Sequence, residues 1–296
     1  MPRRSWVDVV NEQAGVRLTG CGEAAGGETA GAVYVGWPDG HHGVVTRSTV
    51  GAARTRQTAA VLLDARAHGL PVPLYELVVE LPDQSVLVLQ ERLPGEPIMV
   101  LDGAAVTELI SVNERFAGLL AGRYDVPVAP FDVADLVGAD LGSVSERFPM
   151  VAQHSRATAR LVRRIQQAGA LTTMNQAVGD DLVHPDLTSP NVLFGPTGTV
   201  TGVVDWNEGV YRGDRHGALV KLLFDATWDA TCDGGNARVL PDALTTLETH
   251  LRSVLSAPRL RSLWAYWTLS MLDWTIRSDD QTGIRVHLDL GEREFG

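Results

Sequence analysis

Lysine and cysteine are both scarce in this chain of 296 residues. Lys221 is the one lysine, so arginine supplies the other 24 of the 25 basic side chains. The two cysteines, Cys21 and Cys232, lie far apart and in no metal-ligand spacing, which excludes a disulfide framework for a chain of this size. Such sparing use of cysteine is typical of proteins in a reducing compartment, and we expect a cytoplasmic location.

The sequence also lacks long apolar runs and an excess of positive charge. No segment reaches the roughly 18 uninterrupted apolar residues of a membrane-spanning helix. The basic N-terminus, residues 1–8, leads into no apolar run and so does not predict a secretory signal. A nucleic-acid-binding protein needs a basic face, whereas the formal net charge here is −11. We therefore expect neither a membrane nor a nucleic acid as a partner.

Turn signals and hydrophobic periodicity divide the chain into two predicted lobes. Hydrophobic residues make up 45% of the chain, which is enough for a large core. Before Pro94-Gly95 the pattern predicts strands around one helix, at residues 55–67, and after it the pattern predicts mainly helices. The prediction is an α+β protein with a β-rich, nucleotide-binding lobe at residues 1–95 and a helical lobe at residues 96–296.

The segment from residue 182 to residue 206 carries the most informative pattern. The residues that form the pattern, in chain order, are His184, Asp186, Asn191 and, after a short hairpin and an apolar strand, Asp205, which precedes Trp206. Phosphoryl transfer needs a carboxylate that orients or accepts the proton of the attacking hydroxyl, and it needs oxygen ligands for Mg²⁺. One Asp and one Asn on a loop, with a second Asp across a hairpin, supply these groups. The flanking apolar strands would hold them on one point.

This pattern resembles the aminoglycoside phosphotransferase family, whose members share the protein-kinase-like fold and carry His-x-Asp-x-x-x-x-Asn followed by Ile/Val-Asp-Trp. The resemblance covers roughly residues 20–223 and implies a bilobal protein-kinase-like fold. It implies that Asp186 is the catalytic base and that His184 braces the catalytic loop. It also implies that Asn191 and Asp205 bind Mg²⁺ and that ATP, or alternatively GTP, is the co-substrate.

Two further segments fit a nucleotide site. Five glycines between residues 18 and 32, Gly26 and Gly27 among them, lie between two predicted strands, and a glycine loop lets backbone N–H groups approach phosphates. By itself this motif is weak, because the spacing is not Gly-x-Gly-x-x-Gly. In the family the corresponding loop covers the triphosphate, which implies Thr29 as its hydroxyl donor. The resemblance also implies that the purine ring faces the backbone of Gln90, Glu91, Arg92 and Leu93.

The resemblance fails where kinase-fold enzymes hold the α- and β-phosphates with a strand lysine paired to a helix glutamate. Lys221 stands too late in the chain for this role, and Gln57 or a neighbour stands where the glutamate is expected. Arg47 is the nearest cation on the corresponding strand. A guanidinium grips phosphate bidentately and needs no carboxylate to stay charged, although an exposed charge at a strand end explains Arg47 equally well. Tuberactinomycin (viomycin and capreomycin) phosphotransferases, another branch of the family, look similarly irregular at this strand.

A second departure follows the Asp-Trp pair. Family members often continue with Gly-Asp-Pro-x-x-Asp, whose last aspartate buttresses the catalytic loop. This chain reads Gly213-Asp214-Arg215-His216-Gly217-Ala218 instead. The buttress is therefore absent, and Asp214 is left to take part of its role.

The leading prediction is a Mg²⁺-dependent enzyme that moves the γ-phosphate of a nucleoside triphosphate to a hydroxyl of a small molecule, such as an antibiotic in resistance or self-protection. Choline, homoserine and sugar kinases share the loop, so a metabolite kinase is an alternative. The missing Lys and Glu raise a second alternative, a nucleotide-binding pseudokinase, which the retention of all three polar loop residues disfavours. Four carboxylates that could face the opening of the loop predict a cationic acceptor: Glu208, Asp273, Asp279 and Asp280.

Overall fold

The computed structural model describes residues 5–23, 31–48, 50–131, 147–170, 179–231 and 237–296. The glycine loop with Gly26, Gly27 and Thr29 lies outside the described residues. The chain forms two compact units. The first unit comprises Met1–Ile98 and His184–Tyr211, and the second comprises Met99–Val183 and Arg212–Gly296. The predicted lobes follow the order of the chain, whereas the first compact unit also takes in the catalytic loop.

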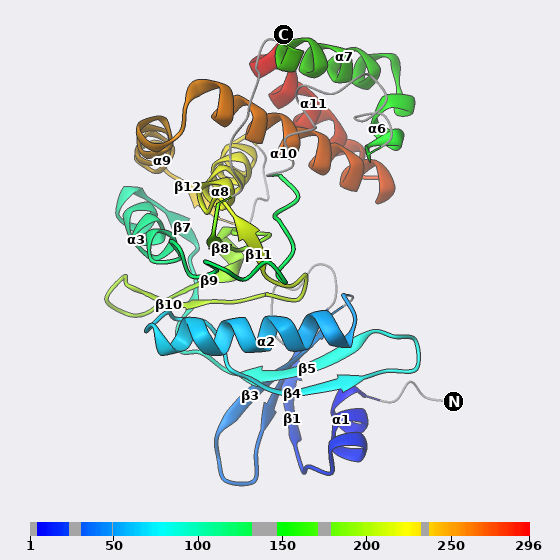
Figure 1. Ribbon diagram of the computed structural model, residues 1–296, viewed down its shortest axis with the longest axis vertical. Coiled ribbons are helices and arrows are strands. Elements are labelled where there is room, and N and C mark those ends of the chain that lie inside the picture. The colour runs from blue at the N-terminus through cyan, green and yellow to red at the C-terminus, as the bar shows by residue number, and fades with distance from the viewer. Residues whose placement is uncertain (1–4, 24–30, 49, 132–146, 171–178, 232–236) are drawn as a thin grey trace. The chain divides into compact units, whose positions relative to one another are not determined.

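The first unit is built on an antiparallel sheet with the strand order β1-β2-β3-β5-β4 (Figure 1). Its strands are β1 (Thr19–Glu23), β2 (Ala32–Gly36), β3 (His42–Ser48), β4 (Tyr75–Glu80) and β5 (Val86–Glu91). Helix α2 (Ala52–Ala67) confirms the helix predicted at residues 55–67. The prediction of one helix is wrong, because α1 (Trp6–Ala14) precedes the sheet.

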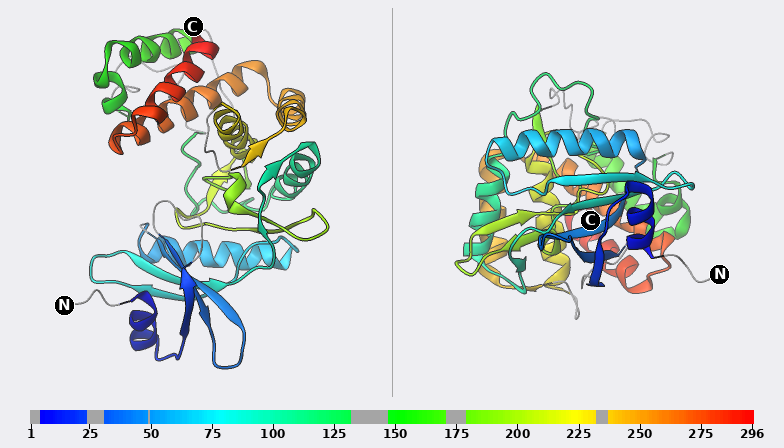
Figure 2. Two further views of the ribbon diagram at one scale, coloured as in Figure 1. Left: turned by 180° about the vertical axis from the view of Figure 1, so that it is seen from behind. Right: turned by 90° about the horizontal axis from the view of Figure 1, so that it is seen from below.

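Helices α1 and α2 cover opposite faces of this sheet. Val7 and Val10 of α1 belong to one apolar cluster with Val45 of β3. The Thr55 hydroxyl of α2 donates to Ser48 Oγ at 3.4 Å. Side chains alternate along a strand, so Val45 and Ser48 belong to opposite faces of β3. Figures 1 and 2 show the two helices on either side of β4 and β5.

A smaller sheet, with the order β10-β9-β6, carries the segment after the catalytic loop. It consists of β6 (Glu96–Pro97), β9 (Val192–Phe194) and β10 (Val200–Val203), and the 3-10 helix η1 (Ser189–Asn191) leads into β9. Gly95 enters this sheet with φ +104°. A Cβ there would lie 2.3 Å from Thr201 Oγ1 and 2.7 Å from the Phe194 carbonyl oxygen, so only glycine fits at this joint.

The second unit is mainly helical. Its helices are α3 (Gly103–Glu114), α6 (Pro149–His154), α7 (Arg156–Ala170), α8 (His216–Asp229), α9 (Pro241–Val254), α10 (Ala257–Arg277) and α11 (Gln281–Phe295). Two strand pairs complete it: β7 (Val100–Leu101) with β12 (Arg238–Val239), and β8 (Asp181–Val183) with β11 (Tyr211–Gly213). Among the described helices, none combines the length and the apolar character needed to cross a membrane.

The single lysine belongs to the interior of the second unit. Lys221 is buried in α8, where its Nζ donates to Asp225 Oδ2 at 2.5 Å. The ammonium group also lies 5.4 Å from the centre of the Trp267 ring of α10. A buried cation needs such partners, so the lysine is committed to α8 and its neighbours.

Candidate active site

His184 fixes the backbone on both sides of the predicted catalytic centre. The buried ring donates from Nε2 to the Val204 carbonyl oxygen at 2.9 Å, and this leaves Nδ1 to accept the Asp186 backbone N–H at 3.1 Å. The edge of the ring packs against Trp206, with 4.3 Å between the ring centroids. The imidazole thus joins the loop that carries Asp186 to the strand end that carries Asp205. Its role as a brace of a catalytic loop stays a prediction.

Asn191 lies directly beside Asp186. Its Nδ2 donates to the Asp186 carbonyl oxygen at 2.9 Å and to Asp186 Oδ2 at 3.3 Å. The backbone N–H of Val204 donates to the Asn191 carbonyl oxygen at 2.9 Å, which ties η1 to the end of β10. Because Nδ2 is engaged with Asp186, the oxygen of the Asn191 amide is the atom left to bind a cation.

Asp205 has a strained backbone and a perturbed carboxyl group. Its φ of +64° falls in the left-handed region, which non-glycine residues adopt mainly where the surrounding structure enforces it, often at functional sites. Burial of the carboxylate within the loop raises the pKa of Asp205, and repulsion by Asp186 raises it further, while His184 opposes the shift. The side chain as a whole keeps an exposed edge, so a ligand can still reach it. Carboxylate and amide oxygens are the ligands that Mg²⁺ prefers, so Asp205 and Asn191 fit this ion.

Asn207 couples Asp205 to the sheet, and sequence reasoning missed this residue. Its Nδ2 donates to Asp205 Oδ1 at 2.6 Å, while its Oδ1 accepts the Thr46 hydroxyl at 2.9 Å. The Ser48 hydroxyl donates to the Asn207 carbonyl oxygen at 2.5 Å. The face of β3 that carries Thr46 and Ser48 therefore sets the orientation of the predicted metal ligand through Asn207.

Helix α2 holds the segment that follows. The Arg54 guanidinium donates to the Val210 carbonyl oxygen, and Thr58 Oγ1 accepts the Val210 N–H at 3.3 Å. Gln57, at or beside the position expected of the kinase glutamate, accepts a hydrogen bond from Arg54 Nη1 at 2.6 Å. In this chain an arginine–glutamine pair on α2 thus anchors the backbone beyond the Asp-Trp pair.

Arg47 faces away from this site. Its Nη2 pairs with Asp83 Oδ2 at 2.6 Å, and its Nε donates to Ser85 Oγ at 3.0 Å. Along β3 it alternates with Thr46 and shares the face of Val45, against which α1 packs. The phosphate contact expected of Arg47 therefore stays a prediction that requires the side chain to leave both partners.

The predicted hinge offers one free backbone donor. The N–H groups of Glu91 and Arg92 donate to the carbonyl oxygens of Leu74 and His42. Within the described part of the chain, the Leu93 N–H has no hydrogen-bond partner. The side chains are used locally: Gln90 is buried, Glu91 pairs with Arg66 at 2.7 Å, and the Arg92 guanidinium lies 4.2 Å from the centre of the Tyr34 ring.

The four predicted acceptor carboxylates have local surroundings of different kinds. Glu208 is exposed in the turn after Asp205. Asp280 caps α11 by accepting the N–H groups of Thr282 and Gly283, and Asp279 accepts a hydrogen bond from the Gln281 amide at 2.8 Å. Asp273 pairs with Arg277 at 2.6 Å. Asp273, Asp279 and Asp280 thus have local partners that do not require an acceptor molecule. The cationic character of the acceptor stays a prediction.

Solved structures with the same fold include antibiotic kinases. A thermostable mutant of aminoglycoside phosphotransferase APH(4)-Ia, in a ternary complex with ADP and hygromycin B, matches with a TM-score of 0.70 and 16% identity over 99% of this chain and 98% of that one. The amicoumacin kinase hAmiN, in complex with AMP-PNP, Ca²⁺ and Ami, matches with a TM-score of 0.66 and 13% identity, covering 98% and 94% of the two chains. A putative fructosamine-3-kinase from Haemophilus somnus matches with a TM-score of 0.61 and 12% identity, covering 99% and 97%. Together they show the α+β protein-kinase-like fold.

The sequence itself gives the family. No curated protein matches the chain by sequence, and the likeness to the tuberactinomycin branch stays a prediction. The model of the phosphotransferase enzyme family APH, however, matches residues 21–259, most of the chain. That range includes the loop with Asp186 and Asn191 and the strand end with Asp205. The chain belongs to the phosphotransferase enzyme family APH.

Proposed function

We propose that this chain is a small-molecule kinase that transfers the γ-phosphate of a nucleoside triphosphate to a hydroxyl group. The observation that carries the proposal is the frame of Asp186 and Asn191, which are hydrogen-bonded to each other, and of Asp205, which follows the Val204 N–H bonded to Asn191, in a member of this family. Two of the matching structures hold ADP or AMP-PNP beside an antibiotic. ATP is therefore the co-substrate we test first, with GTP as the alternative.

Each residue of the frame has a distinct proposed task. Asp186 accepts the proton of the acceptor hydroxyl as the oxygen attacks the γ-phosphorus. Asn191 and Asp205 hold Mg²⁺, which when bound neutralises charge on the phosphates. The raised pKa of Asp205 fits this task, because a cation bound by its carboxylate would offset the desolvation and the repulsion by Asp186 that cause the shift.

The direct test is a transfer assay. Purified chain is incubated with ATP or GTP and Mg²⁺ over a panel of hydroxylated antibiotics, sugars, fructosamines and amino alcohols, and phosphorylated products are identified by mass spectrometry. We expect Mg²⁺-dependent transfer to one chemical class. A protein that binds Mg²⁺·nucleotide but phosphorylates nothing would favour the pseudokinase alternative, and one that binds no nucleotide would overturn both.

The pseudokinase alternative rests on the missing Lys and Glu. In β3 (His42–Ser48) the residue that lies toward Asp205 through Asn207 is Thr46, not a lysine. The Thr46 hydroxyl donates to Asn207. We expect Thr46→Val, which keeps the shape and removes the hydroxyl, to weaken Mg²⁺·nucleotide binding about two- to ten-fold, because Asn207 loses a hydrogen bond worth about 0.5–1.5 kcal/mol. Calorimetry measures the affinity. Thr197→Val, on the exposed hairpin of the same unit, is the matched control, and equal affinities in the two variants would remove Thr46 from the site.

Arg47→Ala tests whether Arg47, the cation that could replace the missing lysine, contacts the phosphates of the nucleotide. Because its guanidinium is held by Asp83 and Ser85 on the other face of β3, we expect the nucleotide KM to change less than about two-fold, in line with a surface ion pair. Asp83→Asn breaks the same pair without removing the cation. A rise in KM of ten-fold or more in Arg47→Ala but not in Asp83→Asn would establish the predicted phosphate contact.

A further inference from the structure

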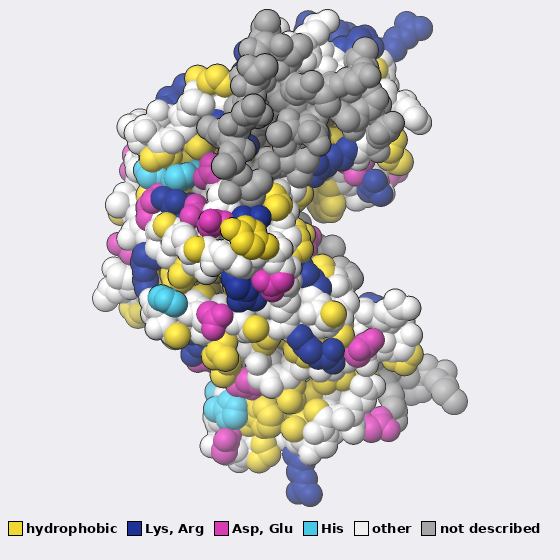
Figure 3. Space-filling model, in the orientation of Figure 1, with side chains coloured by type: hydrophobic (Ala, Val, Ile, Leu, Met, Phe, Trp, Pro, Cys, Tyr) yellow, Lys and Arg dark blue, Asp and Glu magenta, His cyan; other side chains and the backbone are white. Residues whose placement is uncertain are grey.

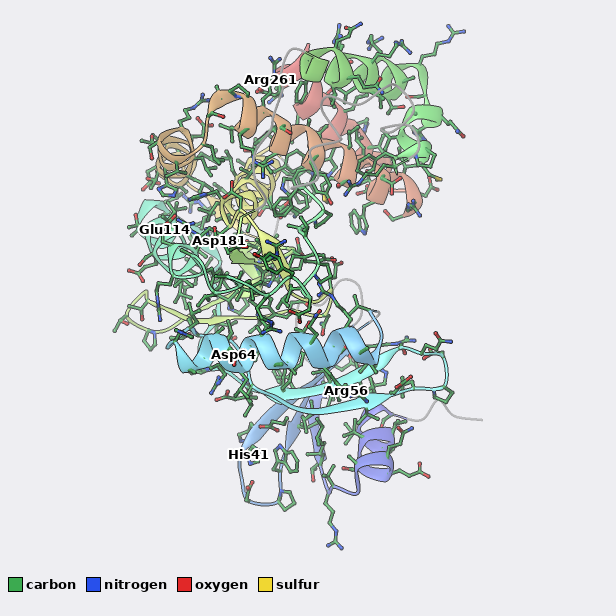
Figure 4. All side chains as sticks on the ribbon, in the orientation of Figure 1. His41, Arg56, Asp64, Glu114, Asp181 and Arg261 are labelled. Atoms are coloured by element: carbon green, nitrogen blue, oxygen red, sulfur yellow. The ribbon has the colours of Figure 1, made fainter. Side chains whose placement is uncertain are left out.

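Three side chains that commonly bind metals meet in the second unit. Glu114 is the last residue of α3, His216 is the first residue of α8, and His250 lies in α9. One ligand atom from each lies within 4.8 Å of the other two. Figure 4 labels Glu114 at the end of α3, and Figure 3 shows a histidine on the surface over α9 with charged side chains beside it. The cluster is partly exposed, so an ion can reach it.

The distances fit a tetrahedral ion. Glu114 Oε1 lies 3.2 Å from His216 Nε2 and 3.5 Å from His250 Nε2. Zinc binds imidazole nitrogen at about 2.0–2.1 Å in tetrahedral sites, which separates neighbouring ligand atoms by about 3.3–3.4 Å. Two edges of the triangle therefore already have the spacing of such a site.

The surrounding groups orient these ligands. The Asp214 carboxylate lies 2.8 Å from His216 Nδ1, so a proton on Nδ1 leaves the Nε2 lone pair directed at Glu114. A carboxylate behind a histidine is a common support for zinc ligands. Arg215 binds the other oxygen of Glu114 and also Asp181, which leaves Glu114 Oε1 for the two histidines.

His250 provides an independent sign of a missing partner. Its Nε2 is buried and has no hydrogen-bond partner among the described residues, although it lies 3.5 Å from Glu114 Oε1. A buried polar nitrogen without a partner is costly.

We propose that Glu114, His216 and His250 bind a zinc ion, with solvent as the fourth ligand. Two imidazoles favour zinc over Mg²⁺, which prefers oxygen ligands. The ion would join the ends or faces of three helices, so its role is to stabilise the second unit. The site is separate from the residues proposed to bind Mg²⁺ and does not depend on the proposed kinase activity.

A proton can replace the ion in the same geometry. A doubly protonated His216 would donate to both Asp214 and Glu114 at the observed distances. That arrangement leaves Nε2 of His250 without a partner, whereas zinc satisfies it. The two explanations differ in whether the folded protein binds metal.

The experiment measures metal binding to the full chain without a histidine tag. Zinc affinity is measured by calorimetry, Co²⁺ coordination by visible absorption, and the melting temperature with and without zinc. We expect one zinc ion per chain, a four-coordinate Co²⁺ spectrum without thiolate bands, and a rise in melting temperature. His250→Gln and Glu114→Gln should each weaken zinc binding at least ten-fold, and Asp214→Asn about 10- to 100-fold.

Two controls locate the ion. His154→Ala, at an exposed histidine of α6, and Asp205→Asn, at the proposed Mg²⁺ site, should both retain zinc binding at Glu114. Absence of zinc binding at micromolar concentrations in the folded wild-type chain would overturn the proposal in favour of a bridging proton. Binding that survives in both His250→Gln and Glu114→Gln would overturn it as well. If one variant fails to fold, the other still decides.

Discussion

Asp186→Asn should reduce kcat by about 10²–10⁴-fold, the usual contribution of a general base, while the affinity for Mg²⁺·nucleotide changes only a few-fold. The substitution removes the proton acceptor and keeps the shape of the side chain. The loop should not move, because His184 holds the backbone N–H of residue 186 and Asn191 holds its carbonyl oxygen. Steady-state kinetics with the best acceptor and calorimetry with a non-hydrolysable nucleotide measure the two quantities.

Asp289→Asn is the control for this prediction, because Asp289 is an exposed aspartate of α11 outside the site. It should leave both quantities unchanged. Near-native turnover in Asp186→Asn would remove the catalytic base from the proposal and leave the carboxylate a structural part of the loop. A comparable loss of nucleotide affinity and of rate would instead indicate a misfolded loop.

The juxtaposition of Asp186, Asn191 and Asp205 could be predicted from the sequence because these residues are close along the chain. Asp186 and Asn191 share one loop, and β9 and β10 form a hairpin that returns the chain to Asp205. The pattern of residue types therefore nearly determines which side chains meet. The grouping of this segment with the sheet could not be read in the same way, because it depends on distant contacts, such as the Val203 N–H that donates to the Pro71 carbonyl oxygen at 2.7 Å.

Two features that were left unpredicted had local signals in the sequence. Helix α1 is capped at its N-terminus by Ser5, whose hydroxyl accepts the Asp8 N–H, and at its C-terminus by Gly15 with φ +66°, and both are common cap residues. The orientation of Arg47 follows from the alternation of β3, which places it with the apolar Val45 and opposite Thr46. Asn207 had no comparable signal, since a polar residue after Asp-Trp fits an ordinary turn. Its hydrogen bonds to β3 depend on the tertiary fold.

Asp205→Asn should have opposite effects on binding and on stability. Removing a carboxylate from the proposed Mg²⁺ site leaves the phosphate charge poorly neutralised, so Mg²⁺-dependent nucleotide affinity and kcat should both fall by at least ten-fold. Asparagine keeps an oxygen that can accept the hydrogen bond from Asn207, so the loop should persist. Calorimetry with and without Mg²⁺ separates the metal-dependent part of the affinity, and an unchanged affinity would exclude Asp205 as a ligand.

The stability of the free protein should rise in the same variant. The pKa of Asp205 is raised in the folded state, so between the unfolded value, about 3.9, and the folded value the native protein binds more protons than the unfolded chain. The free energy of unfolding therefore falls as pH rises through this window, and above it the whole penalty of the buried carboxylate is present. Asp205→Asn removes the penalty, which predicts a higher melting temperature than wild type at pH 7 and no difference below about pH 4.

Scanning calorimetry without nucleotide or metal at both pH values measures this difference in melting temperature. A lower melting temperature of Asp205→Asn at pH 7 would show that the carboxylate stabilises the loop even without its cation. It would contradict the inference that the Asp205 carboxylate lowers the stability of the metal-free protein.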